Sequence, residues 1–178
     1  MWESVRSPSC SSNAVAPECF NRDHPSFLAA LGLLPGRGIE RAAMRRTLAA
    51  VVEHWDMRQI WGWDLPMMAM TAARLGDTEL AVDLLLRDEP NFRFGRAGMT
   101  PRVQYDPSYD SNDTVDGARK CSAGKGFRCV AEAYFPSNGA LLLAVGMMAA
   151  GWDGQTAPQP GFPGEGWVVR SEGLIALP

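Results

Sequence analysis

The sequence has little net charge, no cluster of basic residues and no long apolar run. Its net charge is -3, and the 17 Lys and Arg residues are scattered along 178 positions. Nucleic-acid-binding proteins gather basic residues on one face, so nucleic acid is not an expected partner. The longest apolar stretch, residues 140–150, is too short to span a bilayer, so no membrane segment is predicted. The length is sufficient for one domain with a sizeable core.

The N-terminal segment lacks the continuous apolar core of a signal peptide. The chain as written therefore carries no secretion address. We expect a cytoplasmic protein by default, and a secreted one if a signal lies upstream of this start. Residues 1–20 are rich in Ser and Pro and are predicted to be disordered.

The cysteines lack the spacing of a metal site. They fall in two polar segments and include no C-x-x-C pair: Cys10, Cys19, Cys121 and Cys129. A zinc site is therefore not expected. A disulfide between the two segments and four free thiols both remain open alternatives.

No cofactor or metal is predicted from the remaining residue types. The two histidines, His24 and His54, are isolated from other metal-ligating residues. The methionines of 67–70 and 147–148 are explained by packing in a core, where Met fills irregular gaps. The glycines near 151 and 164 lack the strand and helix that surround a phosphate-binding loop.

Apolar residues at helical spacing predict four helices in the first half of the chain, over 25–34, 39–55, 65–75 and 78–87. Gly76 is predicted to end the third helix in the left-handed conformation, and Asp77 or Thr78 to cap the fourth. A connection this short predicts an antiparallel helical hairpin. A further helix is predicted to begin with a cap at residue 137 or 138 and to end at 150.

The other segments have little helical periodicity. Residues 91–133 are rich in Gly, Arg, Asp and Ser and are too long for an ordinary connection, so they are an irregular insertion, an excursion on the substrate side, or a disordered segment. Residues 167–169 and 173–175 predict a short β-hairpin near the C-terminus. The predicted organisation is a disordered segment 1–20, a helical unit 21–155 that contains the insertion, and a β tail 156–178.

The stretch WGWDLP, residues 61–66, places two indoles and a carboxylate in front of an apolar run. Pro66 suits a first helical turn and Asp64 is a favoured N-cap type, so the tryptophans lie at the mouth of a helix. Flat aromatic rings beside a carboxylate suit a sugar ring, although anchoring in the core is the alternative. Trp61 and Trp63 alternate across Gly62, so we expect the second to face the core if the first faces a pocket.

Several segments together resemble a known family. The stretches NRDHPSFLAALGLLPG, WGWDLPMMAMTAARLGDTELAVDLLL, YFPSNGALLLAVGMMAAGWDG and GWVVRSEGL resemble the C-terminal half of the six-hairpin glycosidase-like proteins. This clan of α/α barrels includes glycoside hydrolase families 65 and 95. The resemblance covers residues 21–90 and 134–178, and it implies a barrel of paired helices that binds carbohydrate at the helix mouths.

Two departures separate the chain from that family. A whole barrel needs a longer chain, so the sequence resembles a fragment. The loop before the last barrel helix of family 95 resembles an Asp-Gly-Asn-Phe-Gly motif whose Asp is the general base, and Pro136 stands at the corresponding place here. The resemblance therefore implies that this base is absent.

Glycoside hydrolysis needs two carboxyl groups, about 5 to 5.5 Å apart for retention and about 6.5 to 9.5 Å apart for inversion. The candidates near the ends of predicted elements are Asp23, Asp64, Glu165 and Glu172. As a helix N-cap, Asp64 accepts backbone N–H groups, and it contacts a sugar as well only if one oxygen stays free. No complete catalytic pair is assigned.

His24 precedes a proline at a helix start. It is either a proton shuttle or a hydrogen-bond partner of a bound sugar, since the ordinary pKa of imidazole lies near neutrality, or a structural or solvated residue. Asp23 beside it either orients the imidazole or caps the helix. The predicted substrate-binding residues are therefore Trp61, Trp63, Asp64 and His24.

These observations predict an all-α fragment of a helical-hairpin barrel, or α/α toroid, with a short C-terminal β-hairpin. The predicted function is hydrolysis or binding of a glycan, and the alternative is a catalytically inactive module that binds carbohydrate or another partner. A carbohydrate is the expected ligand. The exposed apolar flank of a partial barrel also favours self-association.

Overall fold

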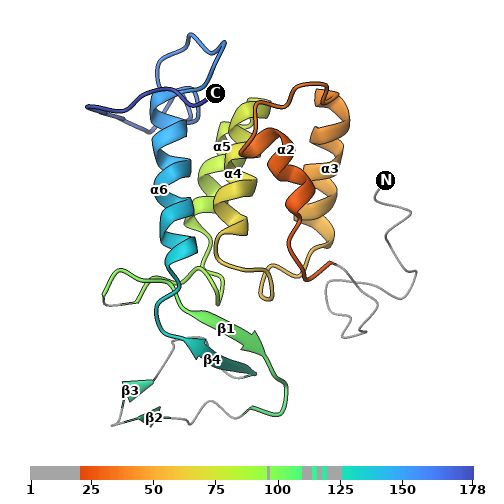
Figure 1. The fold of residues 1–178 in the computed structure, drawn as a ribbon, viewed down its shortest axis with the longest axis vertical. Helices are drawn as coiled ribbons and strands as arrows, with labels where there is room; N and C mark the ends of the chain where they lie inside the picture. The colour runs from red at the N-terminus through yellow and green to blue at the C-terminus, as the bar shows by residue number, and fades with distance from the viewer. Residues whose placement is uncertain (1–20, 96, 110–113, 116–117, 120–125) are drawn as a thin grey trace.

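The computed structural model describes residues 21–95, 97–109, 114–115, 118–119 and 126–178. The predicted disorder of residues 1–20 lies outside these ranges, as do Cys10, Cys19 and Cys121. The described residues form five α-helices, one 3-10 helix and two small antiparallel sheets (Figure 1). The helices stand side by side, and the sheets lie beyond one end of them.

All the predicted helices are present, with small differences in their bounds. In chain order the helical elements are η1 (Ser26–Leu28), α2 (Ala29–Gly32), α3 (Arg41–His54), α4 (Asp64–Leu75), α5 (Thr78–Leu86) and α6 (Phe135–Ala150). Helix α6 begins at Phe135, ahead of the predicted cap. Its first turn accommodates Pro136, because a backbone N–H at that position has no partner within the helix and the proline loses no hydrogen bond by lacking one.

The predicted hairpin of α4 and α5 is confirmed in its details. Gly76 has a φ of 84° and ends α4 in the left-handed conformation. The Asp77 carboxylate then accepts the backbone N–H of Leu80 at 3.2 Å and caps α5. A turn of this kind reverses the chain, so that α5 packs along α4.

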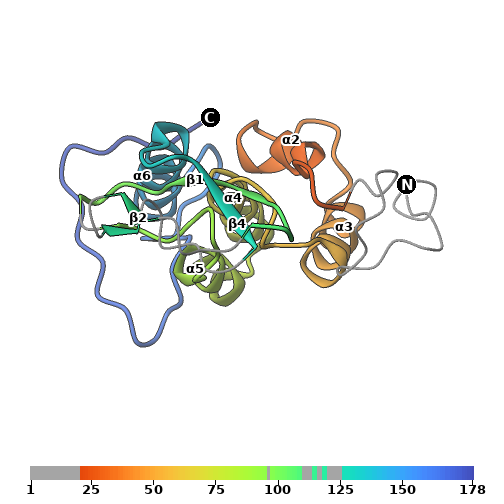
Figure 2. The ribbon, with the colours of Figure 1, turned by 90° about the horizontal axis from the view of Figure 1, so that it is seen from below.

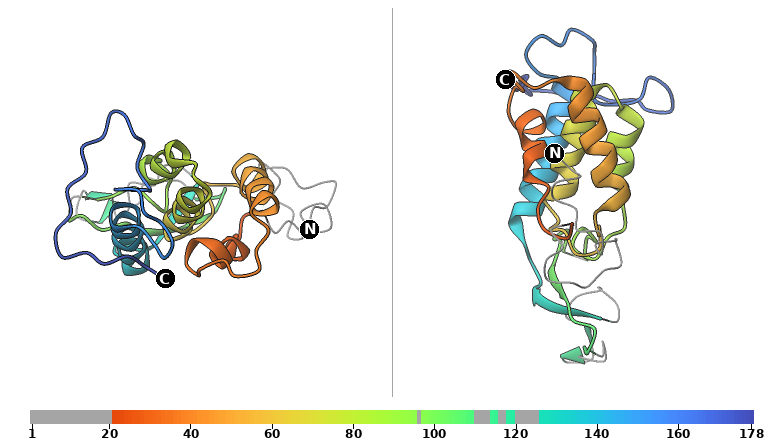
Figure 3. Two further views of the ribbon diagram at one scale, coloured as in Figure 1. Left: turned by 90° about the horizontal axis from the view of Figure 1, so that it is seen from above. Right: turned by 90° about the vertical axis from the view of Figure 1, so that its right-hand side faces the viewer.

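Helix α4 is the centre of the fold. All of its residues are buried, and it contacts α2, α3, α5 and α6. Figure 3 shows it between its neighbours when the helices are viewed from above. Met67, Met68 and Met70 lie wholly inside the hydrophobic core, which confirms that these methionines fill the core.

Several polar groups of α4 form hydrogen bonds with neighbouring segments. The Thr71 hydroxyl donates to the carbonyl oxygen of Leu28 at 3.1 Å. At the C-terminal end, Arg41 of α3 donates to the carbonyl oxygen of Arg74, and Arg45 donates to the last carbonyl of the helix at 2.6 Å. Cations at this end also complement the helix dipole.

The β-structure lies within the segment that was predicted to be irregular. Strand β1 (Arg102–Tyr105) pairs antiparallel with β4 (Phe127–Ala131), and β2 (Thr114–Val115) pairs with β3 (Ala118–Arg119). Seen from below in Figure 2, the β1 and β4 hairpin lies across the end of α4. The segment is therefore a structured cover for one end of the helices.

The predicted C-terminal β-hairpin is wrong. Residues 156–178 form no strand, and their one ladder contact is an isolated bridge between Trp152 and Leu177. Gly166 and Gly173 have φ values of 79° and 69°, which interrupt an extended backbone close to both predicted strands. The apolar Val168 is 86% exposed, so no second layer stabilises a pair of strands here.

The predicted fold class is also wrong. The described residues form a small mixed α/β fold, and their helices do not close into a barrel or toroid. Periodicity identifies which face of each helix is apolar, but it does not determine whether the helices pack in a ring or around one of their number. Here the helices surround α4, all of whose residues are buried.

Helix α6 keeps an apolar face outside the core. Phe135, Leu142, Leu143 and Val145 are all exposed there. Self-association through such a face stays a prediction. No helix among the described residues combines the length and hydropathy that a bilayer crossing needs.

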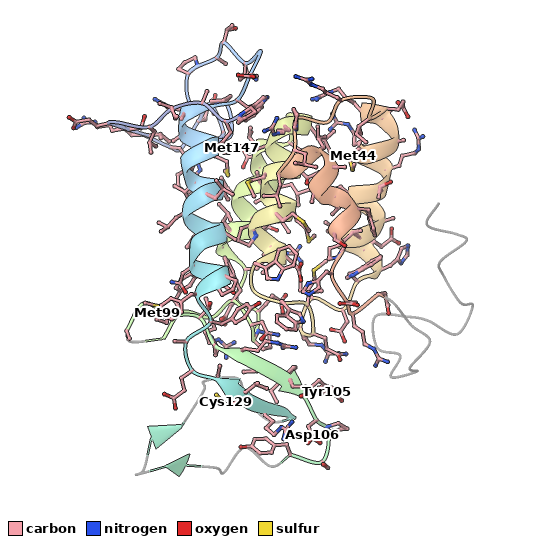
Figure 4. The ribbon with its side chains drawn as sticks, in the orientation of Figure 1. Met44, Met99, Tyr105, Asp106, Cys129 and Met147 are labelled. Atoms are coloured by element: carbon pink, nitrogen blue, oxygen red, sulfur yellow. The ribbon has the colours of Figure 1, made fainter. Side chains whose placement is uncertain are left out.

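Cys129, on β4, is disulfide-bonded. The alternative of four free thiols is therefore excluded. Figure 4 shows Cys129 on the hairpin that extends beyond the helices.

We predict that Gly32→Ala destabilises the fold. A Cβ at Gly32 would lie 2.6 Å from the Thr71 Oγ1 and 2.7 Å from the Met67 carbonyl oxygen, so α2 would have to move away from α4. Overpacking of this kind costs about 1–3 kcal/mol in the free energy of unfolding, measured by urea titration. In the control Gly146→Ala on α6, no atom lies within 4 Å of the added Cβ. Equal stabilities of the two variants would contradict the close contact of α2 and α4.

Candidate functional site

The WGWD stretch forms the loop that enters α4, at the end of the helices covered by the β1 and β4 hairpin. Gly62 is required there by close packing. A Cβ at this position would lie 2.1 Å from the Asn91 carbonyl oxygen and 2.2 Å from the Ser137 Oγ. The two indoles of Trp61 and Trp63 are therefore separated by a residue that must be glycine.

Asp64 lies at the first position of α4 with none of its surface exposed. Its Oδ2 accepts the backbone N–H of Trp61 at 2.7 Å, and the Nδ1 of His24 lies 3.0 Å from both carboxylate oxygens. The helix N-cap is Trp63, which makes no side-chain cap bond. Asp64 therefore closes the preceding loop rather than capping α4.

Burial controls the protonation of Asp64. It raises the pKa of the carboxyl from its ordinary 3.8 to about 6, because the charged form loses its hydration. The neighbouring His24 and the N–H of Trp61 oppose this rise. Asp64 therefore exchanges a proton in the mildly acidic range.

The His24 imidazole lies against both indoles. Ring centroids are 5.1 Å apart for His24 and Trp61, and 4.6 Å apart for His24 and Trp63. The Nε2 of His24 is 4.0 Å from an oxygen of Asp23, whose side chain is 71% exposed, whereas the His24 side chain is 27% exposed. The imidazole therefore contacts a buried carboxylate on one side and an exposed carboxylate on the other.

Asp23 also joins this segment to α3. Its carboxylate accepts the His24 backbone N–H at 2.8 Å, and its carbonyl oxygen accepts the indole N–H of Trp55 at 2.7 Å. Trp55 itself lies in the core. The segment that carries the imidazole is thereby anchored to the end of α3.

Three residues that the sequence analysis missed complete the surroundings of Trp61. The Arg102 guanidinium carbon lies 4.0 Å from the centroid of the indole, and Tyr134 packs edge to face with it at 5.4 Å. Asn91 is 1% exposed, donates to the Ile60 carbonyl oxygen at 2.9 Å and accepts the Val103 N–H at 2.7 Å. Asn91 thus joins the WGWD loop to strand β1.

No helical periodicity points to these three residues, because they lie in or next to the segment 91–133. The one available signal is the short RVQY stretch, residues 102–105, in which polar and apolar residues alternate as in a strand. That signal locates a strand, and only the tertiary structure shows that the strand passes beside Trp61.

A pocket of about 340 Å³ opens beside Trp61, and it is lined by Arg22, Gln59, Trp61, Arg102, Gln104, Tyr105 and Pro107. Figure 4 shows Tyr105 on the hairpin below the helix ends. Trp61 lines this pocket, whereas the predicted binding residues Trp63, Asp64 and His24 do not. These three residues lie close to Trp61 but outside the pocket lining, and Asp64 and His24 contact Trp61 directly.

Trp63 belongs to a different surface. It packs on the hydrophobic core and lines an apolar groove together with Leu33, Met67 and Pro136. The indoles therefore divide as the alternation across Gly62 predicts: Trp61 faces a pocket and Trp63 faces the core. Pro136, which stands where the resemblance places a general base, contributes only apolar surface to this groove.

The remaining candidate carboxylates lie elsewhere. Glu165 and Glu172 are exposed and belong to the C-terminal segment, which lies at the opposite end of the helices from the hairpin (Figure 1). The structure therefore brings together Asp23 and Asp64 but not Glu172. Among the described residues, no three His, Cys, Asp or Glu side chains form a group that suits a metal ion.

Comparison of the chain with protein-family models, with curated proteins and with solved structures finds no match. The pocket combines two aromatic rings with guanidinium and amide donors, which suits a ligand that has both apolar faces and hydrogen-bonding edges.

We predict that Asp64→Asn removes a pH dependence of stability. The folded pKa of about 6 exceeds the ordinary 3.8, so the folded chain retains this proton to higher pH than the unfolded chain. The stability that Asp64 contributes is present below about pH 4 and is lost as the pH rises through about 6, with an upper limit of about 3 kcal/mol.

The measurement is urea unfolding of both proteins at several pH values between 4 and 7. The wild-type stability should fall relative to Asp64→Asn as the pH rises, whereas the exposed Asp83→Asn should follow the wild type. His24, Asp23, Tyr134 and Arg102 surround Asp64 in both proteins. If the free energies of unfolding of wild type and Asp64→Asn change in parallel with pH, the raised pKa of Asp64 in the folded chain is contradicted.

Proposed function

We propose that this chain binds carbohydrate in the pocket beside Trp61. The observation that carries the proposal is the composition of the pocket wall, where two aromatic rings stand among side chains that donate hydrogen bonds. A sugar ring presents C–H groups on its faces and hydroxyl groups at its edges. Aromatic surface matches the faces, and guanidinium and amide groups match the hydroxyls.

The size and support of the pocket are consistent with this ligand class. Its volume of about 340 Å³ lies at the lower end of the range for small-molecule sites. The backbone N–H of Trp61 donates a hydrogen bond to the Asp64 carboxylate, and its indole contacts the side chains of His24, Tyr134 and Arg102. An anchor held in this way loses little conformational freedom when a ligand packs against it.

In this proposal Asp64 and His24 are positioning residues. Asp64 has no exposed surface, its Oδ2 accepts the Trp61 N–H, and both of its oxygens lie 3.0 Å from the His24 Nδ1, so it does not line the pocket. The resemblance to glycosidase-like proteins agrees with a sugar ligand. The proposal rests on the pocket, because the described helices do not form the barrel that the resemblance implies.

Glycoside hydrolysis is the second candidate, and one observation favours it. The pKa of Asp64 is raised to about 6, which is the range of a carboxyl that acts as a general acid near neutral pH, although in this structure the carboxyl is buried and does not line the pocket. The reaction also needs a second carboxyl group across the bond. Asp23 is the nearest candidate, since its oxygen lies 4.0 Å from the His24 Nε2.

We expect Trp61→Leu to weaken sugar binding by about tenfold or more, equivalent to about 1.4 kcal/mol, because the aromatic wall of the pocket is lost. Binding is measured by NMR titration with neutral and acidic monosaccharides and disaccharides. The control is Trp167→Leu, which removes a half-exposed indole from the C-terminal segment. Binding that is unchanged in Trp61→Leu, or no sugar binding by the wild type, would overturn the proposal.

A panel of aryl glycosides separates binding from hydrolysis. If the chain only binds sugar, neither the wild type nor Asp64→Asn releases the aryl group. If it hydrolyses glycosides, the wild type turns over at least one member of the panel, and Asp64→Asn, which keeps the shape of the side chain, loses that activity. Turnover by the wild type would replace the binding proposal with the enzymatic one.

A further inference from the structure

We propose that the pocket beside Trp61 selects sugars that carry a carboxylate, such as uronic acids, through the guanidinium of Arg102. This inference rests on the proposed function, because it names the class of sugar that the same pocket takes. It is carried by the charge of the pocket wall and by the arrangement of hydrogen bonds around Arg102.

Among the residues that the structure describes, the wall of the pocket has cations but no anion. Its lining includes Arg22 and Arg102 with two glutamines, and no Asp or Glu. Asp23 and Asp106 adjoin the lining in sequence, and Asp56 lies three residues before Gln59. Each has protein partners: the Asp23 carboxylate accepts the His24 backbone N–H, Asp56 accepts hydrogen bonds from Arg58 and Gln59, and Asp106 accepts them from Ser108. The described lining itself therefore presents guanidinium groups and no carboxylate to a ligand.

Arg102 is half-buried and has no carboxylate partner among the described residues. Its Nη1 donates to the Asn91 Oδ1 at 3.3 Å and to the Val103 carbonyl oxygen. Its Nε and Nη2 have no acceptor within the described part of the chain. Partly buried guanidinium groups are ordinarily paired, because the loss of hydration must be compensated.

The surroundings of Arg102 hold its guanidinium in one place. Asn91 is fixed by the Ile60 carbonyl oxygen and the Val103 N–H, and the Trp61 ring lies 4.0 Å from the guanidinium carbon. Burial lowers the pKa of Arg102, while the charges of Tyr134 and Asp64 raise it. The planar guanidinium of Arg102 stacks on the Trp61 indole and donates hydrogen bonds through Nη1. Its other N–H groups can therefore donate to a carboxylate of a ligand.

The same wall explains why a sugar acid fits better than a simple anion. Trp61 and Tyr105 supply aromatic surface in the pocket that also contains Arg102. A uronic acid combines an apolar ring face with a carboxylate at its edge, so it can use both features together. Acetate or phosphate can use only the charge.

The test compares methyl β-D-glucuronide with methyl β-D-glucoside, which differ only in the oxidation of C6, on the purified full chain by NMR titration. The galacturonide and galactoside pair is measured in parallel, and acetate and phosphate are the simple-anion probes. We expect at least one uronide to bind about tenfold or more tightly than its neutral partner, with affinity that decreases as salt is added.

Two variants assign the preference to one side chain. Arg102→Gln should weaken binding of the uronide far more than binding of the glucoside, so that the preference is lost, while the dispersed NMR spectrum of the variant reports that the chain is folded. Arg102→Lys keeps the charge but not the fork and should retain only part of the preference. The control Arg46→Gln changes the net charge equally on the exposed surface of α3 and should leave the preference unchanged.

The outcomes separate this inference from the function on which it rests. A uronide preference that is lost in Arg102→Gln supports it. Equal binding of the neutral and acidic partners overturns the inference and leaves sugar binding in place, whereas binding of neither overturns both. Acetate or phosphate binding as tightly as the uronides, or a preference unchanged in Arg102→Gln, also overturns it.

Discussion

The buried carboxylate of Asp64 joins the central helix to the site. It begins α4, accepts the Trp61 N–H and contacts the His24 imidazole, so it connects the start of α4 and the preceding loop to a segment that is 40 residues away in the chain. A buried carboxylate is costly unless its oxygens have partners, and these hydrogen bonds offset that cost. Any rearrangement of the WGWD loop breaks at least one of them. The position of Trp61, and with it the shape of the pocket, therefore depends on this interaction.

The hairpin of β1 and β4 contributes the other half of the site. Asn91 joins the hairpin to the WGWD loop through the Ile60 carbonyl oxygen and the Val103 N–H. Arg102 then lies over the Trp61 indole, and Tyr105 lines the same pocket. The helices thus supply a rigid base with a buried carboxylate, and the hairpin supplies the cation and the second aromatic ring. This division explains why a segment without helical periodicity carries residues that are central to the proposed function.

The site is better suited to recognition than to proton transfer at a ligand. Its exposed carboxylate, Asp23, and its buried one, Asp64, lie on either side of His24, and neither lines the pocket. The pocket wall is cationic and aromatic. Electrostatic attraction and ring contacts of this kind favour binding of an anionic sugar, while bond cleavage requires two carboxyl groups that reach the ligand. The proposed preference for uronic acids follows from the same charge distribution as the preference for binding over hydrolysis.

The sequence by itself determined the helices, because their apolar periodicity and local caps act within a few residues: Gly76 and Asp77 define the hairpin of α4 and α5 without any tertiary information. It also indicated that Trp61 and Trp63 face different surroundings. The packing of helices around α4, the absence of a barrel among the described residues and the β1 and β4 hairpin were decided by the tertiary structure, because they depend on contacts between distant segments. The same is true of Arg102 and Asn91: nothing near them in the chain indicates that they meet Trp61, and only the folded hairpin brings them there.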